Sequence, residues 1–336
     1  MKPQRVEQIL DAAASRRFLV IGDVMLDEFV WGKVGRISPE APVPVVEVTG
    51  ESFYPGGAAN VARNLREFTG GVAVLGAVGK DRSGETLREL LASEQIQLLN
   101  SVSPAGFQTI VKTRIIARHQ QVVRVDRERV WPLPLADIGQ LTKAVREKLP
   151  DFDAIIFEDY GKGFISGELV AQIARDARAA GKIVAADPNP TNPIDWSGMT
   201  VVKPNRSEAF LAAGLAWRDP QESPEMDGDL LRAGETLINK WHADNILITL
   251  GEQGMMLFQS GRRPHHIPTK ARQVFDVSGA GDTAIALFTL ALCSEATPIE
   301  AAEIANHGSA VVVAKLGTAT VNRAELLASF HDEIVA

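Results

Sequence analysis

The chain lacks the features that mark secreted, membrane-bound and nucleic-acid-binding proteins. Its 336 residues include one cysteine, Cys293, so no disulfide can form within the chain, as is usual in the reducing cytoplasm. Residues 1–17 are charged and helix-like without the apolar centre of a signal peptide, and apolar runs elsewhere are too short to span a bilayer. The net charge of −7 is spread without long runs of one sign. We therefore expect a cytoplasmic protein that binds neither a membrane nor a nucleic acid.

Two common nucleotide-binding motifs are also missing. The sequence has no Gly-x-x-x-x-Gly-Lys-Ser/Thr loop, which excludes a P-loop kinase, and no Gly-x-Gly-x-x-Gly dinucleotide fingerprint. With 45% apolar and 23% charged residues, the composition is that of an ordinary globular protein. Because α/β enzymes of this length often form on one sheet, we expect a single domain over residues 1–336.

Short apolar runs alternate with helical stretches along the chain. The runs of strand length are 18–21, 72–76, 154–157, 183–186, 200–202 and 245–249. The helical stretches between them include 83–93, 135–149, 168–180 and 228–241. Runs of this kind are typical of strands buried on both faces. The sequence therefore predicts an α/β fold with a mostly parallel central sheet, helices on both faces and ligands at the carboxyl ends of the strands.

Four further strand-length stretches break this alternation. Residues 29–34 and 43–48 flank a proline-rich turn, and residues 109–117 and 121–127 alternate apolar and polar side chains like a hairpin. These strands are too short to enclose a core of their own. They predict a small β-sheet lid, from about 29–48 and 109–127, in which the hairpin faces residues 36–45.

The stretch Asp276-Val277-Ser278-Gly279-Ala280-Gly281-Asp282-Thr283 leads into a mostly apolar helix. Small residues at 278–281 allow a tight turn that brings backbone amides close to an anion at a helix N-terminus. Asp282 then lies where these amides converge. A base beside an anion site is what phosphoryl transfer to a hydroxyl requires. The structural alternative is a glycine-rich loop capped by Ser278 or Asp276.

A second glycine motif, Tyr54-Pro55-Gly56-Gly57-Ala58-Ala59-Asn60, precedes another helix and reads as a loop at the helix start. Together with residues 22–27, 204–208 and 249–254, the two motifs resemble, in order and spacing, the signatures of the ribokinase-like (PfkB) carbohydrate kinases. The resemblance covers essentially the whole chain. It implies a ribokinase-like fold, a β-sheet lid, and ATP and Mg²⁺ as cofactors.

The resemblance implies a role for each residue of the 276–283 motif. Asp282 would take the proton from the attacking sugar hydroxyl, and the amides of Gly279, Ala280 and Gly281 would stabilise the transferring phosphoryl group. An acid that only complements the helix dipole contributes about 0.3–1 kcal/mol. That alternative leaves the preceding glycines unexplained.

The sugar side of the site is implied by the N-terminal motifs. Asp27 would hold sugar hydroxyls, since a carboxylate accepts two hydrogen bonds in one plane. Gly56, Gly57 and Asn60 would border the sugar, with helix capping as the alternative. Asp23 is also near, but an aspartate after a strand is often only a turn residue.

The motifs later in the chain imply the residues that bind the nucleotide and the metal. Asn205 and Glu208 would lie around Mg²⁺, largely through water, although the same spacing forms a helix capping box and both roles can hold together. The remaining candidates are Thr249, Gly251 and Gly254 for the ribose and phosphates, Asn306 and His307 for the adenine, and Asp276, Ser278 and Gly317 for a monovalent cation such as K⁺, which some relatives bind.

Residues 36–45, 118–126 and 159–163 resemble more narrowly the D-glycero-D-manno-heptose-7-phosphate 1-kinases. These enzymes phosphorylate the anomeric hydroxyl of heptose 7-phosphate, giving the 1,7-bisphosphate, on the way to ADP-heptose for lipopolysaccharide. The resemblance adds Asp159 to the sugar site. A phosphorylated sugar also needs cations, because guanidinium groups bind phosphate through paired hydrogen bonds. The candidates are Arg36, Lys112, Arg114, Arg118, Arg124 and Lys162, of which we expect two or three to touch the ligand.

The same comparison bears on partners and on departures from the pattern. Lids in this family often pair between subunits, so we expect a homodimer formed through the lid. The subfamily often carries a fused nucleotidyltransferase with a His-x-Gly-His motif; the motif does not occur here, and we expect a separate nucleotidyltransferase downstream.

Asn189 stands where the subfamily usually has lysine. This departure leaves open a kinase for another sugar, sugar phosphate or nucleoside, such as ribose or fructose 1-phosphate. A sugar-binding regulator without catalysis is a third interpretation, against which an intact Asp282 argues.

Overall fold

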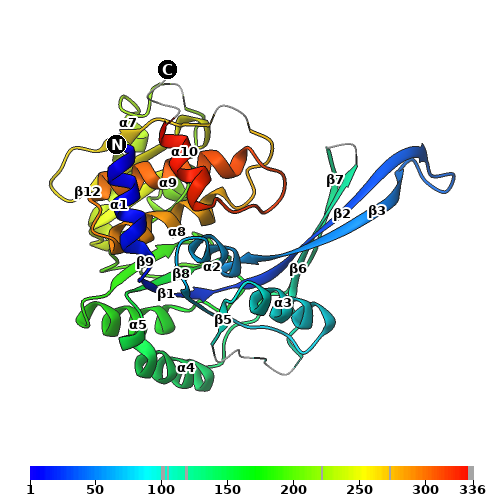
Figure 1. The fold of residues 1–336 in the computed structure, drawn as a ribbon, viewed down its shortest axis with the longest axis horizontal. Helices are drawn as coiled ribbons and strands as arrows, with labels where there is room; N and C mark the ends of the chain where they lie inside the picture. Colours follow the sequence, from blue (N-terminus) through cyan, green and yellow to red (C-terminus); the bar gives the residue numbers. More distant parts are fainter. Residues whose placement is uncertain (100–102, 104–105, 118–119, 221, 272–273, 332–336) are drawn as a thin grey trace.

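A mixed β-sheet forms the centre of the body (Figure 1). The computed structural model describes residues 1–336 except 100–102, 104–105, 118–119, 221, 272–273 and 332–336. Within the described residues the sheet has nine strands in the order β13-β12-β11-β10-β9-β8-β1-β4-β5, parallel from β11 to β5 and antiparallel at β12 and β13. The strands are β1 (Arg17–Gly22), β4 (Gly71–Leu75), β5 (Gln97–Leu98), β8 (Ala154–Glu158), β9 (Ile183–Asp187), β10 (Val201–Val202), β11 (Asn245–Thr249), β12 (Met255–Gln259) and β13 (His265–Ile267). The predicted mostly parallel sheet is confirmed.

Helices cover both faces of this sheet. Along β1 the side chains of Phe18 and Val20 enter one core cluster, and those of Leu19 and Ile21 enter the other, as the two-residue period of a strand requires. The first cluster is completed by α1 (Pro3–Ala13), α2 (Ala58–Arg66), α3 (Arg82–Ser93), α8 (Ala280–Cys293), α9 (Pro298–Val313) and α10 (Arg323–His331). The second is completed by α4 (Leu135–Lys148), α5 (Gly167–Ala179), α6 (Arg206–Ala212) and α7 (Gly228–Trp241).

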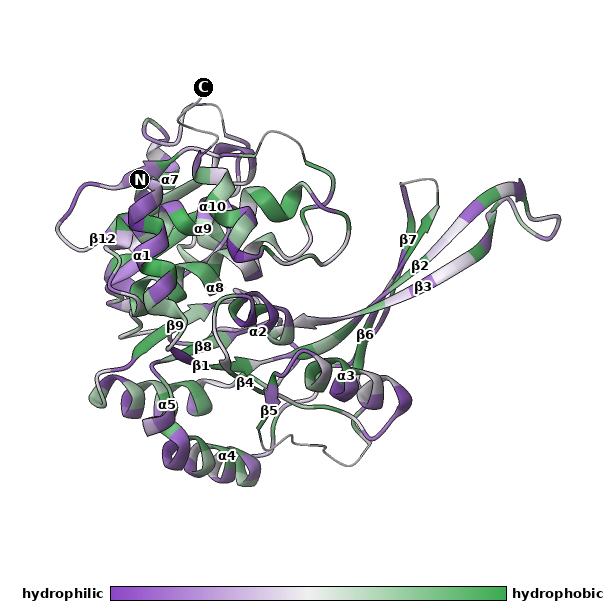
Figure 2. Cartoon of the chain, viewed as in Figure 1, coloured by the Kyte–Doolittle hydropathy of each residue, from purple (hydrophilic) through white to green (hydrophobic). Residues whose placement is uncertain are grey.

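Helix α8 lies at the middle of the first cluster. Nearly all of its side chains from Asp282 to Cys293 are buried, as expected for a helix that is apolar all round. Figure 2 shows α8 largely in green, whereas much of α1 and α4 is purple. Because its N-terminus emerges at the carboxyl ends of the strands, this buried helix fixes the position of Asp282 firmly.

The lid is a separate four-stranded sheet in the order β3-β2-β6-β7, which projects from the body as an arm (Figure 1). Its strands are β2 (Val24–Ile37), β3 (Pro44–Gly57), β6 (Ile110–Ala117) and β7 (Gln120–Arg127). The predicted lid is confirmed, but β2 and β3 are longer than expected. Strand β6 pairs with Met25–Gly32 of β2, so the hairpin flanks the base of the arm and does not face residues 36–45.

Two motifs therefore lie on different elements than the sequence suggested. Asp27 is inside lid strand β2, which begins at Val24 and not at the predicted residue 29. Gly56 and Gly57 end strand β3, so a strand, not a loop, leads into α2. Gly57 makes this junction possible because its φ of +59° is a conformation that other residues rarely adopt.

The structure also bears on membrane insertion. Among the described residues, no helix has both the length and the apolar character needed to cross a bilayer.

Candidate active site

Asp282 occupies the first turn of α8 and is almost fully buried, with 5% of its surface exposed. Its Oδ2 accepts a hydrogen bond from Asn60 Nδ2 at 2.6 Å, and its Oδ1 accepts one from the Tyr160 hydroxyl at 2.9 Å. Burial raises the pKa of Asp282 to about 6, while the bond from Asn60 opposes this rise. A carboxyl group with this pKa is ionised at neutral pH and can accept a proton.

Backbone conformation favours glycine at position 279, and both glycines before Asp282 have close neighbours. Gly279 has a φ of +79° and precedes α8 as its N-cap, and a Cβ there would lie 2.8 Å from Asn60 Nδ2. A Cβ on Gly281 would lie 3.3 Å from Lys203 Nζ. Neither Ser278 nor Asp276 caps the helix, so the structural alternative for this motif is not what the chain adopts.

Asp27 marks the lid side of the site. Its Oδ1 accepts a hydrogen bond from Arg114 Nη1 at 2.5 Å, and its Oδ2 accepts one from Thr318 Oγ1 at 3.2 Å. Gly56, on the paired strand β3, leaves room for this carboxylate, because a Cβ there would lie 2.4 Å from Asp27 Oδ2. Arg114 also lies over the ring of Phe29, 5.2 Å from its centre. Three of the predicted sugar-site residues are thus in direct contact.

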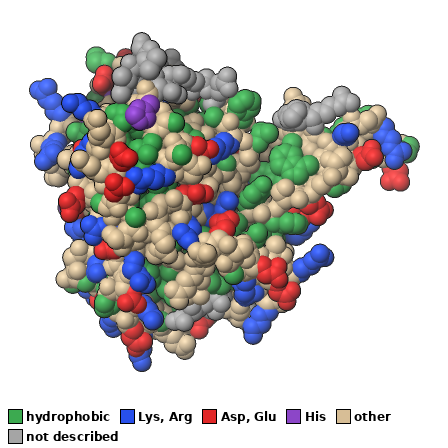
Figure 3. Space-filling model, in the orientation of Figure 1, with side chains coloured by type: hydrophobic (Ala, Val, Ile, Leu, Met, Phe, Trp, Pro, Cys, Tyr) green, Lys and Arg blue, Asp and Glu red, His purple; other side chains and the backbone are tan. Residues whose placement is uncertain are grey.

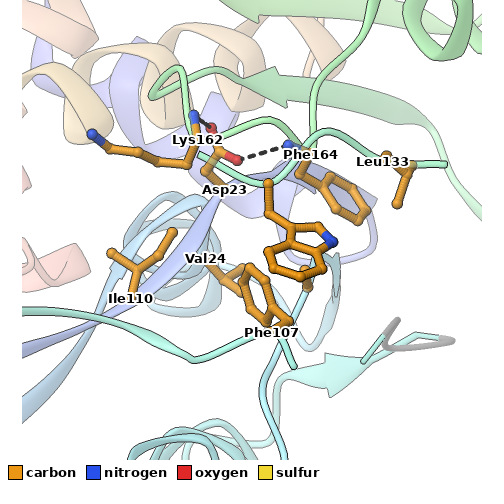
Figure 4. A pocket seen from close by; sticks show the side chains of 9 residues that line it. Asp23, Val24, Phe107, Ile110, Leu133, Lys162 and Phe164 are labelled. Carbon is orange, nitrogen blue, oxygen red and sulfur yellow. Dashed lines mark hydrogen bonds between the residues drawn. The ribbon is translucent and has the colours of Figure 1, made fainter. Parts of the chain in front are cut away.

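Asp23 serves the loop after β8 instead. Its carboxylate accepts hydrogen bonds from the backbone amides of Tyr160 and Lys162, each at 3.0 Å, and of Phe164 at 3.2 Å. Figure 4 shows two of these bonds beside a small apolar cavity. Burial raises the pKa of Asp23 although the amides lower it. These contacts give Asp23 the turn-holding role that was the alternative to sugar binding.

Three other predicted sugar-site residues are paired within the protein. Asp159 accepts hydrogen bonds from Gly161 N at 2.8 Å and Asn192 Nδ2 at 2.9 Å, and burial raises its pKa to about 7. Lys162 Nζ bonds to Glu128 at 2.7 Å. The exposed Arg124 pairs with its strand neighbour Asp126 at 2.9 Å. Arg118 lies outside the described residues.

Two adjoining cavities lie on the nucleotide side of Asp282. One, of about 680 Å³, is lined by Asp282 together with Asn205 and Glu208. The other, of about 500 Å³, is mostly apolar and contains Asn306. The residues that line both are Thr249, Gly251, Glu252, Val277 and Gly281, and Gly254 lines the second. Such a continuous cleft has room for a nucleoside triphosphate, with its base in the apolar part.

His307 does not belong to this cleft. Its ring stacks on Phe330, with the ring centres 3.6 Å apart, and its Nδ1 lies 3.1 Å from Ser329 Oγ. Asn306, one residue earlier, lines the apolar cavity and donates from its Nδ2 to Pro268 O at 2.7 Å. The expectation that His307 lines the adenine pocket is wrong, because neighbouring helix residues point in different directions.

Asn205 and Glu208 form the capping box at the start of α6. The Asn205 side chain accepts from Glu208 N at 2.9 Å, and the Glu208 carboxylate accepts from Asn205 N at 2.7 Å. Both residues also line the larger cavity. The capping role is therefore confirmed, and the metal role stays a prediction.

Glu158, Asp187 and Lys203 were missed by the sequence reasoning. Carboxylate oxygens of Glu158, Asp187 and Asp282 lie within 4.8 Å of one another, and Lys203 Nζ pairs with Asp187 at 2.8 Å. Burial raises the pKa of Glu158 well above its usual range, and its Oε2 has no hydrogen-bond partner among the described residues. Burial would lower the pKa of Lys203, but the charges of Asp187 and Glu208 raise it. Oxygen donors of this kind suit Mg²⁺.

A signal for these residues existed in the sequence. Glu158 and Asp187 are the last residues of β8 and β9, and Lys203 follows β10 directly. Charged residues at the carboxyl ends of buried parallel strands lie where ligands bind in such sheets. Asn189, the departure from the heptose-kinase pattern, also lines the larger cavity.

The residues predicted to hold a monovalent cation lie close together. Asp276 Oδ1 accepts a hydrogen bond from Ser278 N at 2.9 Å, and its Oδ2 accepts one from Gly317 N at 3.2 Å. The contacts join the loop before α8 to the loop after α9, on either side of the site.

Comparison with known proteins agrees with this geometry. The sequence profile of the pfkB family carbohydrate kinases matches residues 15–325. The "Bifunctional protein HldE" of Desulfatibacillum aliphaticivorans is 39% identical over 323 residues, which are 96% of this chain and 65% of that protein. This chain therefore spans about two thirds of the length of that relative.

Solved structures share the fold at lower identity. Phosphofructokinase-2 from Escherichia coli in complex with potassium aligns with a TM-score of 0.74 and 19% identity, over 94% of this chain and 98% of that one. Ribokinase from Thermotoga maritima aligns with a TM-score of 0.68 and 19% identity, over 94% and 99%. The body and lid described above are thus the ribokinase-like fold.

Proposed function

The chain belongs to the pfkB family of carbohydrate kinases, and we propose that it transfers the γ-phosphoryl group of ATP to the anomeric hydroxyl of D-glycero-D-manno-heptose 7-phosphate. One observation carries the proposal. Asp282, a buried acid with a pKa raised to about 6, lies at the end of a cleft large enough for a nucleotide. The likeness of residues 36–45 and 159–163 to the heptose kinases, and 39% identity to an HldE protein, support the choice of sugar.

The chemical step is a single displacement. Asp282 accepts the proton of the anomeric hydroxyl as the hydroxyl oxygen attacks the γ-phosphorus. A new oxygen–phosphorus bond forms, the bond from the γ-phosphorus to the β,γ-bridging oxygen breaks, and ADP leaves. The amides of Gly279, Ala280 and Gly281, at the positive end of α8, stabilise the charge on the transferring group. Lys203, close to Gly281, adds a positive charge there.

The cofactors are ATP and Mg²⁺. Bound Mg²⁺ neutralises charge on the phosphates, and Asp187, Asn205 and Glu208 would hold it through oxygen atoms or water. The support is the oxygen-rich lining of the larger cavity. K⁺ is a further candidate near Asp276, Ser278 and Gly317, supported by their mutual contacts and by the potassium complex of a structural relative.

The sugar lies between Asp27 and Asp282. Asp27 accepts hydrogen bonds from sugar hydroxyls, while Asn60 and Gly57 border the ring. The distal phosphate is bound by cations of the lid, with Arg114 the candidate that lies nearest to Asp27. A positive side chain that is mostly buried binds phosphate more strongly than an exposed one, because water screens it less.

The lid also supplies the proposed dimer contact. Five apolar side chains on its strands are exposed in the single chain: Ile37, Val48, Val122, Val123 and Val125. Figure 3 shows hydrophobic atoms gathered along the arm. Exposed apolar residues concentrated on one projecting sheet are typical of a protein interface. A second copy of the chain is the partner that we propose.

A panel of acceptors tests the proposed substrate. ADP release is measured with heptose 7-phosphate, unphosphorylated heptose, fructose 1-phosphate and ribose, with the Asp282→Asn protein as the control for contaminating kinases. We expect kcat/KM for heptose 7-phosphate to exceed each of the others by at least about tenfold, the effect of one charge-assisted contact. A phosphorus NMR spectrum of the product should show the new phosphate at the anomeric position. A preference for ribose or fructose 1-phosphate would replace the heptose assignment by another member of the family.

A further inference from the structure

The carboxylate of Asp282 is held from two sides. Asn60, on α2, donates to Oδ2 at 2.6 Å, and Tyr160, in the loop after β8, donates to Oδ1 at 2.9 Å. We propose that Tyr160 is a positioning residue, which fixes the plane of the Asp282 carboxylate for proton transfer. This inference rests on the proposed function, in which Asp282 is the base.

One donor alone cannot fix this carboxylate. A carboxyl group turns readily about its terminal torsion, because that torsion has broad and shallow minima. A second hydrogen bond, to the other oxygen, defines the plane of the group. Proton transfer depends on such alignment, since a candidate base must lie within hydrogen-bond reach of the proton in the right direction.

The loop that carries Tyr160 is itself rigidly anchored. Asp23 accepts hydrogen bonds from the amides of Tyr160, Lys162 and Phe164, and Figure 4 shows the bonds to Lys162 and Phe164. The loop reverses direction at Gly161 and Gly163, whose φ angles are +68° and +101°. Three bonds to one buried carboxylate leave the Tyr160 backbone little freedom.

The phenol ring is also fixed. Lys112 Nζ, from lid strand β6, lies 5.3 Å from the centre of the Tyr160 ring, within the range of a cation–π contact. The hydroxyl keeps its proton, because burial and the charge of Asp282 raise the pKa of Tyr160 well above its ordinary value. Tyr160 is therefore a permanent donor to Asp282.

This arrangement links the base to the root of the lid. Asp23 directly precedes strand β2, and Lys112 lies on β6, which pairs with β2. The positioning residue thus contacts both the body and the lid. Asn60 lies on α2, which follows lid strand β3 directly, so both donors to Asp282 adjoin the root of the lid.

A conservative variant tests the role of Tyr160. Tyr160→Phe removes the hydroxyl and keeps the ring. We expect kcat to fall by about ten- to a hundredfold, the effect of losing a hydrogen bond to a charged acceptor, while KM for ATP and sugar stays within about threefold. Thr289→Val is the matched control: it removes a different buried hydroxyl, which lies on α8 and bonds to Ile285 O, and should leave kcat unchanged.

A double-mutant cycle separates positioning from general stability. In an Asp282→Asn background, Tyr160→Phe should cost less than about twofold in kcat, because the base that Tyr160 positions has already been removed. An equal loss in both backgrounds would show that Tyr160 acts independently of Asp282 and would overturn the proposal, as would a Tyr160→Phe protein with wild-type kcat. If Asp282→Asn alone retains wild-type turnover, the proposed base itself is wrong, and the role of Tyr160 falls with it.

A spectroscopic measurement covers the case in which Tyr160→Phe does not fold. The chain has two tyrosines, so Tyr54→Phe leaves Tyr160 as the single site for 3-fluorotyrosine. We expect the fluorine resonance of Tyr160 to shift when Asp282 is replaced by alanine, because the acceptor of its hydroxyl is removed. An unchanged resonance would overturn the contact on which the proposal depends.

Discussion

The two sides of the site are built in different ways. On the body side, Asp282, Asn60 and Tyr160 are bonded to one another, and Asp282 is almost completely buried. On the lid side, Arg124 is exposed and paired within its own strand, and the valines of β7 face solvent. The body side thus holds its chemical groups ready in the single chain. The lid side leaves surface free for a ligand or a partner.

The energetic reason lies in burial. A buried polar group that lacks a partner costs about 1–3 kcal/mol, so the body must satisfy its carboxylates within the fold. Exposed ion pairs contribute only about 0–1 kcal/mol, so the pairs of the lid can be exchanged for substrate contacts at little cost. Arg114 and Asp27, both mostly buried, belong to the body in this respect although they lie on lid strands. The boundary between the buried, internally paired groups and the exposed, exchangeable ion pairs therefore lies at the base of the lid.

The largest effect should follow from Asp282→Asn. If Asp282 is the base, the change lowers kcat by roughly 10²–10⁴-fold, the usual contribution of a positioned base. ATP affinity should stay nearly unchanged, because Asp282 lies at the end of the nucleotide cleft and most of the lining comes from other residues. ADP release gives the turnover and titration calorimetry gives the affinity; turnover within a few-fold of wild type would remove Asp282 from this role.

The same residue sets the expected pH dependence. Only the ionised carboxylate accepts a proton, and burial raises its pKa to about 6. kcat/KM should therefore be constant above about pH 7 and fall by about tenfold per unit well below pH 6. A profile flat down to pH 4.5, with the protein still folded by circular dichroism, would contradict the raised pKa.

The motif at 276–283, for which we propose the catalytic role, could be located in the sequence because it is local. Asp282 and its glycines are neighbours in the chain, and their chemistry follows from a turn at a helix start. Glu158, Asp187 and Lys203 come from three different strands, and only the pairing of β8, β9 and β10 brings them together. The sequence places each of them at the end of an apolar run, but no short stretch of sequence shows which of these strands are neighbours.

The lid was predicted for a related reason. The strands at 109–117 and 121–127 are visible in the sequence by their alternation of apolar and polar residues, and those at 29–34 and 43–48 by the proline-rich turn that they flank. The start of β2, from Val24 to Asp27, is buried on both faces and lacks this alternation. The partners of Asp23, the amides of Tyr160, Lys162 and Phe164, could not be read from the sequence either, because they lie far away in the chain.

The next largest effect should follow from replacing Arg114 of the lid, with Arg124 as the comparison. Arg114→Ala should lower kcat/KM for heptose 7-phosphate by about ten- to more than a hundredfold, because it leaves the buried Asp27 without its partner and removes a cation near the sugar. Arg124→Ala, which breaks an exposed pair, should cost less than about threefold. Steady-state kinetics with both the phosphorylated and the unphosphorylated heptose measures the two effects.

Comparison of the losses with the two sugars shows how Arg114 acts. A larger loss with heptose 7-phosphate than with heptose indicates direct contact with the distal phosphate. An equal loss indicates that Arg114 acts through Asp27. An Arg124→Ala protein that loses more than Arg114→Ala would contradict the division of the site described above.

The smallest effect on turnover should come from the outer face of the lid. Val123 and Val125 lie two residues apart on β7, on the same face of the strand, and are 45% and 39% exposed. If this face meets a second copy of the chain, Val123→Lys places a charge in an apolar contact from both subunits. Full burial of a valine contributes about 1.5–3 kcal/mol, so even partial loss at two symmetric positions should weaken the dimer about tenfold or more.

Sedimentation velocity measures the dissociation constant, and Val130→Lys is the control, because Val130 is also exposed but lies outside the lid strands. Turnover should stay within about twofold, since Val123 contacts none of the residues that hold Asp282. A wild-type protein that is monomeric at micromolar concentration, or equal dissociation by Val130→Lys, would show that the exposed valines of β7 have another purpose.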